Sequence, residues 1–209
     1  AAGVEGELMG FGGATARLFA QEGAKVVLTD IKEDMGQKTA AQINETGGDA
    51  LFMRLDVTDE QNWIEVIRST VKTYGKLDVL VNNAGMLLRV PVVPLPDEGL
   101  RPPQVTREST TSTSDEEWQS VLDTNLSGVF CCCRAVAPHM IERRYGKIIN
   151  ISSNNATQAF PLVAAYNASK AAVNMLTRVL ALEWAPYSIC VNAIGPGPFH
   201  TPLSDASWT

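Results

Sequence analysis

The sequence predicts an α/β domain of three layers, in which helices cover both faces of a doubly wound parallel sheet. Short apolar runs rich in β-branched residues alternate along the chain with amphipathic helical patterns. Because parallel strands need crossover connections, this alternation predicts right-handed strand–helix–strand units. The chain has 209 residues, 45% of them hydrophobic, which is enough to bury the core of one such domain. We therefore expect residues 1–209 to form a single domain.

Five strands are predicted from apolar runs that are short enough for a sheet covered on both faces. They lie at residues 25–30, 50–55, 77–81, 147–151 and 189–194. Residues 1–5 (AAGVE) lack a strand pattern. The first strand of the sheet is therefore predicted to be incomplete or altered.

Capping signatures mark the starts of two helices. Thr58 is predicted as an N-cap with Gln61 reaching back to it, and this helix ends at Gly75. Ser114 and Glu117 repeat the signature before the next helix. Two longer helices are predicted at residues 126–144 and 163–184, and the second stops before Pro186.

The segment 86–113 breaks the alternation of strands and helices. It contains five of the eleven prolines, ends in a run of serines and threonines, and has no helical or strand period. Long structureless loops are uncommon in compact domains and are usually functional or disordered. We interpret it as an insertion near the mouth of the site, with a plain surface excursion as the alternative.

Composition excludes several classes of function. A net charge of −6 at pH 7 argues against nucleic-acid and anionic-membrane partners, which require a basic surface. The sequence has neither an apolar run long enough to span a membrane nor a signal-peptide pattern. Three of the four cysteines are consecutive and point in different directions on a helix, so no metal site is predicted. We expect buried thiols in a cytoplasmic protein.

A glycine-rich segment precedes the first predicted helix, which begins near residues 13–14. Gly6, Gly10 and Gly12 would let the backbone turn tightly and approach a pyrophosphate at the helix N-terminus. Asp30 ends the next strand, where a carboxylate accepts both ribose hydroxyls of an adenosine and repels a 2′-phosphate. With Ile31 after it, and no cation among residues 7–9, the sequence favours NAD over NADP. A helix cap is the alternative role of Asp30.

A second constellation lies late in the chain. Tyr166 and Lys170 are four residues apart, so their side chains share one face of a helix. An adjacent ammonium would lower the pKa of the phenol and allow it to exchange protons with a substrate oxygen. Ser153 follows the predicted strand 147–151 and can reach the same pocket from the edge of the sheet.

Together these motifs resemble the short-chain dehydrogenase/reductase family, whose members have a Rossmann fold. The resemblance rests on motifs that follow the family's order and spacing over almost the whole chain: GELMGFG at residues 6–12, Asp30, Asp56-Val57, Asn82-Asn83-Ala84-Gly85, Asn125, Ser153, Tyr166-x-x-x-Lys170 and Pro196-Gly197. The overall character is similar to 3-oxoacyl-carrier-protein reductases and to secondary-alcohol dehydrogenases.

The resemblance implies a role for each matching residue. Tyr166 would be the general acid/base, Lys170 would lower its pKa and bind the nicotinamide ribose, and Ser153 would orient the substrate oxygen. Asn125 would hold a water of the proton relay. The implied NAD-binding residues are Gly6, Gly10, Phe11, Gly12, Asp30, Ile31, Asp56, Val57, Asn82, Ala84, Gly85, Tyr166, Lys170, Pro196, Gly197 and Thr201.

The same resemblance implies hydride transfer between NAD(H) and a secondary alcohol or ketone, by a homotetramer. A non-catalytic dinucleotide-binding or scaffold protein is the alternative. Two departures from the family support that alternative. Glu5 replaces the threonine that usually precedes the first loop glycine, and the usual lid and last strand are missing near residues 203–209. We hypothesise that residues are absent around these positions.

Overall fold

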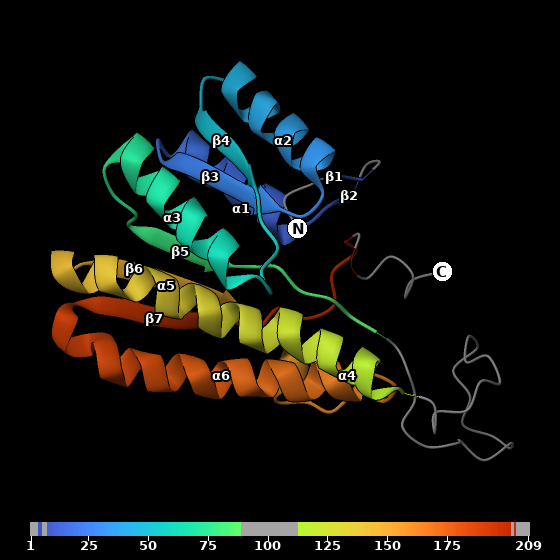
Figure 1. Ribbon diagram of the computed structural model, residues 1–209. Coiled ribbons are helices and arrows are strands. Elements are labelled where there is room, and N and C mark those ends of the chain that lie inside the picture. The colour runs from blue at the N-terminus through green and yellow to red at the C-terminus, as the bar shows by residue number, and fades with distance from the viewer. Residues whose placement is uncertain (1–3, 6–7, 89–112, 202, 204–209) are drawn as a thin grey trace, which may run out of the picture.

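The chain forms the predicted α/β architecture. The computed structural model describes residues 4–5, 8–88, 113–201 and 203 (Figure 1). Its helices and strands, in chain order, are β1 (Val4–Glu5), β2 (Leu8–Met9), α1 (Phe11–Gln21), β3 (Lys25–Asp30), α2 (Glu33–Glu45), β4 (Asp49–Arg54), α3 (Glu60–Tyr74), β5 (Val79–Asn82), α4 (Asp115–Leu122), α5 (Gly128–Arg143), β6 (Gly146–Ile151), α6 (Ala164–Trp184) and β7 (Ile189–Ile194).

The described strands pair in three separate groups. β3 pairs in parallel with β4, and β6 lies between β5 and β7 in a second parallel sheet. β1 and β2 form a small antiparallel pair apart from both sheets. The expectation that the first strand is altered is therefore confirmed, because the segment before the glycine loop contributes no described strand to the parallel sheets.

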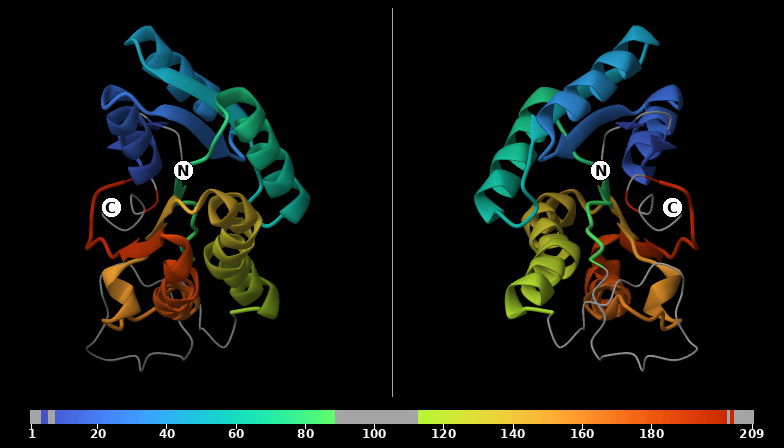
Figure 2. Two further views of the ribbon diagram at one scale, coloured as in Figure 1. Left: turned by 90° about the vertical axis from the view of Figure 1, so that its left-hand side faces the viewer. Right: turned by 90° about the vertical axis from the view of Figure 1, so that its right-hand side faces the viewer.

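Helices cover the two sheets on opposite faces. α3 and α5 lie side by side on one face, whereas α1 lies across from them (Figure 2). The crossovers through α5 and α6 step in the same direction along the second sheet, so right-handed connections place both helices on one face. Their apolar side chains meet around Ile148 of β6 in the largest core cluster. Leu28 of β3 belongs to a smaller cluster with α1 and α2.

A cavity of about 580 Å³ separates the two parallel sheets. It lies between β3 and β5, with Ala16 of α1 on one side and Trp63 of α3 and Cys132 of α5 on the other. β3 and β5 each pair with a described neighbour on one edge only. Sheets rarely leave such edges uncovered, because unpaired backbone groups are costly when buried and prone to aggregation when exposed.

Alternation along the strands shows which backbone groups face this cavity. The carbonyl of Asp30 accepts a hydrogen bond from Leu55, and that of Asp78 accepts one from Lys147, so these residues face β4 and β6. Both backbone groups of a strand residue point to the same side, and the side alternates along the strand. The residues that face the cavity are therefore Val27 and Thr29 of β3 together with Val79 and Val81 of β5.

The predicted element boundaries agree closely with the structure. β3 and β7 match their predicted ranges, and the other three strands differ by one or two residues at an end. α6 begins one residue later than predicted and ends at Trp184. α1 begins at Phe11, two residues earlier than expected. α2 had no specific prediction, although Glu33 and Asp34 complement the helix dipole in its first turn.

One capping prediction was wrong. Asp59, not Thr58, caps α3, because its carboxylate accepts the backbone N–H groups of Gln61 and Asn62. The Thr58 hydroxyl instead donates to Asp56 at 2.7 Å. The predicted end of α3 at Gly75 is confirmed by a left-handed φ of 78°.

The second capping box is confirmed, but the helix after it is not a simple α-helix. Ser114 accepts the N–H of Glu117, whose carboxylate accepts the N–H of Ser114. One turn of π-helix, Asp123–Ser127, joins α4 to α5. The helix predicted at residues 126–144 is therefore the end of a longer segment, and its π turn contains Asn125.

The prediction that the cysteines are buried holds for two of the four. Cys132 and Cys133 are buried in the core, and burial raises the pKa of the Cys133 thiol to about 12. Cys131 is half-buried, and Cys190 is exposed on β7. All four thiols are free. Within the described residues, no helix has both the length and the apolar character needed to cross a membrane.

Candidate active site

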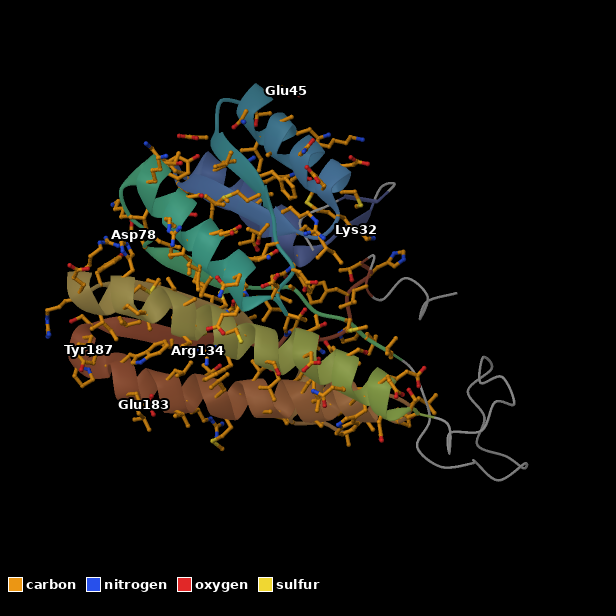
Figure 3. The ribbon with its side chains drawn as sticks, in the orientation of Figure 1. Lys32, Glu45, Asp78, Arg134, Glu183 and Tyr187 are labelled. Atoms are coloured by element: carbon orange, nitrogen blue, oxygen red, sulfur yellow. The ribbon has the colours of Figure 1, made fainter. Side chains whose placement is uncertain are left out.

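A cleft of about 840 Å³ runs along the carboxyl edge of both sheets. This volume lies within the roughly 300–1,000 Å³ typical of ligand sites. Figure 3 shows its position by contrast: Lys32, which lines the cleft just after β3, lies far from Asp78 and Tyr187 at the opposite edge. Ligands of open α/β sheets bind outside the carboxyl ends of the strands.

The three reacting side chains predicted from the sequence meet in this cleft. Ser153, Tyr166 and Lys170 all line it. Ser153 follows β6 directly, whereas Tyr166 and Lys170 lie one turn apart near the start of α6. The Lys170 ammonium lies 5.6 Å from the centre of the Tyr166 ring.

Burial dominates the titration of this pair. Lys170 is 4% exposed, and its Nζ donates to the Ile151 carbonyl at 2.8 Å. Desolvation lowers the pKa of Lys170 to about 8. The pKa of Tyr166 is raised by burial, against which a hydrogen bond with Ser153 acts to lower it. The expected net lowering of the Tyr166 pKa is therefore not seen, because burial of the phenol raises it. An effect of Lys170 on this pKa stays a prediction.

Asn125 is buried, and its side chain forms hydrogen bonds with Met86 and Ser169. Its Oδ1 accepts the N–H of Met86 at 2.8 Å, and its Nδ2 donates to the Met86 carbonyl and to Ser169 Oγ. A Cβ on Gly85 would lie 3.3 Å from that Oδ1, so glycine suits this close approach. Asn125 therefore ties the segment after β5 to α6, and its role in a proton relay stays a prediction.

The part of the cleft next to the start of α1 and the end of β3 contains the predicted cofactor residues that come first in the chain. Gly10 is the N-cap of α1, and Phe11 begins that helix beside it. Asp30 and Ile31 line the same wall. Asp30 is buried, and its Oδ1 accepts the N–H of Lys32 at 3.0 Å. The helix-cap alternative for its role is not supported, since Lys32 is the N-cap of α2 and makes no side-chain cap bond.

The middle of the cleft is formed by segments that follow β4 and β5. Asp56, Val57, Ala84 and Gly85 line it as predicted. Hydrogen bonds from the hydroxyl and the N–H of Thr58 lower the pKa of the Asp56 carboxyl. Asp56 is therefore a fixed anionic acceptor at physiological pH.

The segment that follows β7 forms the remaining wall of the cleft. Pro196, Gly197 and Thr201 line the cleft as predicted, and Thr201 is buried. The ring of Phe199 meets the ring of Phe11 edge-on, with centroids 5.3 Å apart. This contact joins the segment after β7 to the start of α1 across the cleft.

Two of the predicted cofactor residues that the structure describes, Gly12 and Asn82, do not line the cleft. Gly12 lines the cavity between β3 and β5 instead. The Asn82 amide donates to Asn150 at 2.8 Å and lies in that same cavity wall, so it supports the sheet. Gly6 lies outside the described residues, as do most of the predicted insertion at 86–113 and the end of the chain after residue 203.

Sequence reasoning missed much of the rest of the wall. The missed lining residues are Thr29, Lys32, Met35, Leu55, Thr124, Ile151, Ser152, Asn154, Asn155, Phe160, Pro161, Leu162, Val163, Pro198, Phe199 and Leu203. Most of them follow the carboxyl end of a strand, a position that can be located once the strands are known. The apolar run Phe160–Val163 has no such signal, because its place depends on how the loop before α6 folds back.

Known proteins are similar to this chain in both sequence and fold. The family model described as short chain dehydrogenase matches residues 1–209. Cyclopentanol dehydrogenase of Comamonas sp. is 37% identical over 201 residues, which cover 96% of this chain and 73% of that protein. NAD-dependent glycerol dehydrogenase of Listeria innocua is 38% identical over 205 residues, covering 98% and 72% of the two chains.

A crystal structure of gluconate 5-dehydrogenase from Burkholderia cenocepacia, in complex with NADP and tartrate, superposes with a TM-score of 0.82 at 34% identity. The match covers 95% of this chain and 71% of that one. These relatives support an oxidoreductase that acts on CH–OH groups with a nicotinamide dinucleotide. The chain belongs to the short-chain dehydrogenase family.

Proposed function

We propose that this protein transfers a hydride between NAD(H) and a secondary alcohol or ketone, with Tyr166 as the general acid/base. The observation that carries the proposal is the convergence of Ser153, Tyr166 and Lys170 on one cleft beside the glycine loop. Ser153 is placed by the end of β6, whereas Tyr166 and Lys170 share one face of α6.

In the oxidation direction, Tyr166 accepts the hydroxyl proton of the alcohol while the carbon gives up its hydride. Ser153 binds the same substrate oxygen and stabilises the charge that develops on it. The nicotinamide supplies the hydride acceptor, and Pro196, Gly197 and Thr201 form the wall that would hold it. Lys170 lies behind the phenol, where it would bind the nicotinamide ribose and favour the phenolate. In reduction the proton and the hydride move in the opposite directions.

We propose NAD as the cofactor because of Asp30. Its buried carboxylate at the end of β3 would accept the ribose hydroxyls and disfavour a 2′-phosphate. Lys32 lines the same wall and would act in the opposite sense. A titration of both cofactors decides between the two residues: NADP(H) preference in the native chain, reversed by Asp30→Ala, would contradict the assignment.

The described cleft wall is rich in apolar side chains, which favours an uncharged substrate. Met86, Leu87, Phe160, Leu162 and Phe199 contribute apolar surface to it. Lys32 and Lys170 are the only cationic side chains among the described residues of the wall, and Lys170 Nζ already donates to the Ile151 carbonyl. We therefore propose a cyclic or branched secondary alcohol as the substrate.

The experiment is a panel of secondary alcohols with NAD, comparing the native protein with Tyr166→Phe. Activity in the native protein that is lost in the variant supports the proposal. Equal background rates in both would instead support a non-catalytic dinucleotide-binding protein.

We also propose a homotetramer packed through α5 and α6. Met175, Val179 and Leu182 are spaced along one stripe of α6 and are 56%, 41% and 79% exposed. A stripe of this size normally packs against another surface. Light scattering that shows a stable monomer would contradict the proposal. A cytoplasmic location stays a prediction.

A further inference from the structure

The turn after Ser153 contains two consecutive asparagines, and the second, Asn155, reaches across to α6. Its Nδ2 donates to Oδ1 of Asn167 at 2.9 Å. Asn155 follows Ser153 by two residues, and Asn167 follows Tyr166 by one. One amide–amide hydrogen bond therefore links the turn that carries Ser153 to the helix that carries Tyr166.

The carbonyl of Phe160 fixes the direction of this chain of amides. A carbonyl only accepts, and it receives the Asn167 Nδ2 at 2.8 Å. Asn167 must then turn its Oδ1 toward Asn155, which answers with its Nδ2. The Asn155 Oδ1 is consequently left facing the Ser153 hydroxyl, which donates to it at 3.4 Å or to Asn154 Oδ1 at 3.3 Å.

Ser153 Oγ is held from a second direction by the same residue. It accepts the backbone N–H of Asn155 at 3.2 Å. Asn167 is held likewise, since its backbone N–H donates to the Val163 carbonyl at 2.9 Å. One side-chain bond, from Asn155 to Asn167, thus joins the Ser153 turn to the first turn of α6, and the bond from Asn167 to the Phe160 carbonyl ties the preceding loop to the same turn.

We propose that Asn155 and Asn167 are positioning residues that set the place and orientation of the Ser153 hydroxyl relative to the Tyr166 phenol. The inference rests on the proposed function and deepens it. Without the pair, the Ser153 turn and the loop that carries Phe160 would both lose their tie to α6, and Ser153 would shift relative to Tyr166. Small displacements of reacting groups are costly, because acid–base and oxyanion contacts depend on geometry within fractions of an ångström.

The test compares Asn155→Ala, Asn167→Ala and the double variant, with Thr157→Ala as the matched control. Thr157 lies in the same turn and its hydroxyl bonds the Asn154 carbonyl, outside the chain of amides. We expect each single asparagine variant to lower kcat for alcohol oxidation about tenfold, with the KM for NAD within about twofold. The double variant should be no slower than the worse single, because either change breaks the same chain.

Asn155→Asp separates hydrogen bonding from volume. It keeps the size of the side chain and its acceptor toward Ser153, but it removes the donor to Asn167. We expect it to be as slow as Asn155→Ala. Independent, multiplying losses in the single variants, or full activity of Asn155→Asp, would overturn the proposal.

A titration of Tyr166 tests the same inference without turnover. The tyrosinate absorbance of each variant is measured against a matched Tyr166→Phe background. The charged side chain facing the phenol, Lys170, is unchanged in all variants. Because the Ser153 hydrogen bond lowers the Tyr166 pKa, Asn167→Ala, which leaves the Asn155 acceptor in place but frees the Ser153 turn from α6, should titrate at higher pH than the native protein and Thr157→Ala. An unshifted titration would overturn the positioning role even if the alcohol panel gave no activity, whereas an inactive native protein with a shifted variant would overturn the proposed function alone.

Discussion

The two parallel sheets of this molecule differ in how completely they are built. β6 is paired on both edges, and its sheet carries Ser153 at one end and packs against α6, which carries Tyr166 and Lys170. β3 is paired on one described edge, and its other edge opens on the cavity beside β5. The proton-transfer groups thus rest beside a strand that is paired on both edges, whereas Asp30 ends a strand whose other edge faces the cavity.

The largest expected effect is the loss of activity on replacing Tyr166, which lies on the helix packed against the sheet of β6. Tyr166→Phe removes the acid/base hydroxyl and should lower kcat by about 10²–10⁴, the usual range for general acid–base catalysis. Tyr187→Phe, at the opposite edge of the molecule, should have no effect (Figure 3). Steady-state kinetics with the best alcohol of the panel measures both. Retention of more than a tenth of the native rate by Tyr166→Phe would place the acid/base elsewhere.

Matched cavity variants compare the two cores. Ile148 of β6 and Leu28 of β3 are both buried, but only Leu28 lies in the wall of the open cavity. Ile148→Ala should lower the free energy of unfolding by about 2–5 kcal/mol, and Leu28→Ala by clearly less, because fewer atoms pack around it. Urea unfolding at neutral pH gives both values. Equal losses would indicate that the cavity is filled in solution.

The buried ammonium of Lys170 makes stability depend on pH. Its pKa is about 8 when folded and 10.5 for an ordinary lysine, so the unfolded chain binds more protons between these values. The free energy of unfolding should therefore rise with pH across this window, by at most roughly 3 kcal/mol from this residue. Lys170→Met should remove that part of the pH dependence. A variant that keeps the native slope would show that the ammonium is solvated.

Asp30→Ala tests the support of the cofactor. Loss of a charged hydrogen-bond acceptor costs about 1.5–3 kcal/mol, so the preference for NAD over NADP should fall about 10- to 100-fold. Asp34→Ala removes the same charge from an exposed position in the first turn of α2 and is the control. Kd values for both cofactors, from fluorescence titration, give the ratio. A change of similar size in the control would attribute the effect to net charge.

Hydrogen exchange resolves the open edge residue by residue. The amides of Val27 and Val81 face the cavity, whereas those of Leu28 and Leu80 face a paired strand. We expect the first pair to exchange at least about tenfold faster than the second, although all four lie in strands. Uniform protection along β3 and β5 would mean that another segment pairs with both edges.

The sequence predicted features that depend on neighbours in the chain. The four-residue spacing of Tyr166 and Lys170 places both on one turn of α6, and the apolar runs of β3 and β7 give their bounds directly. It failed where two local devices compete. Thr58 and Asp59 are both good caps, and the choice went to Asp59 because Asp56 takes the threonine hydroxyl.

Other site features could not be predicted because they depend on contacts across the fold. The π turn around Asn125 goes with its hydrogen bonds to Met86, 39 residues away. The Asn155–Asn167 bond depends on where the loop before α6 returns.

The sequence by itself determined the α/β class, the family motifs and the identity of the reacting groups, because helical spacing and strand ends follow from local periodicity. Only the tertiary structure decided the direction of the Tyr166 pKa. Burial is a property of the whole packed core, and here it raises this pKa against the lowering effect of the Ser153 hydrogen bond. The cavity beside β3 also depends on the tertiary structure, because the pairing of all the described strands determines which strand edges are left unpaired.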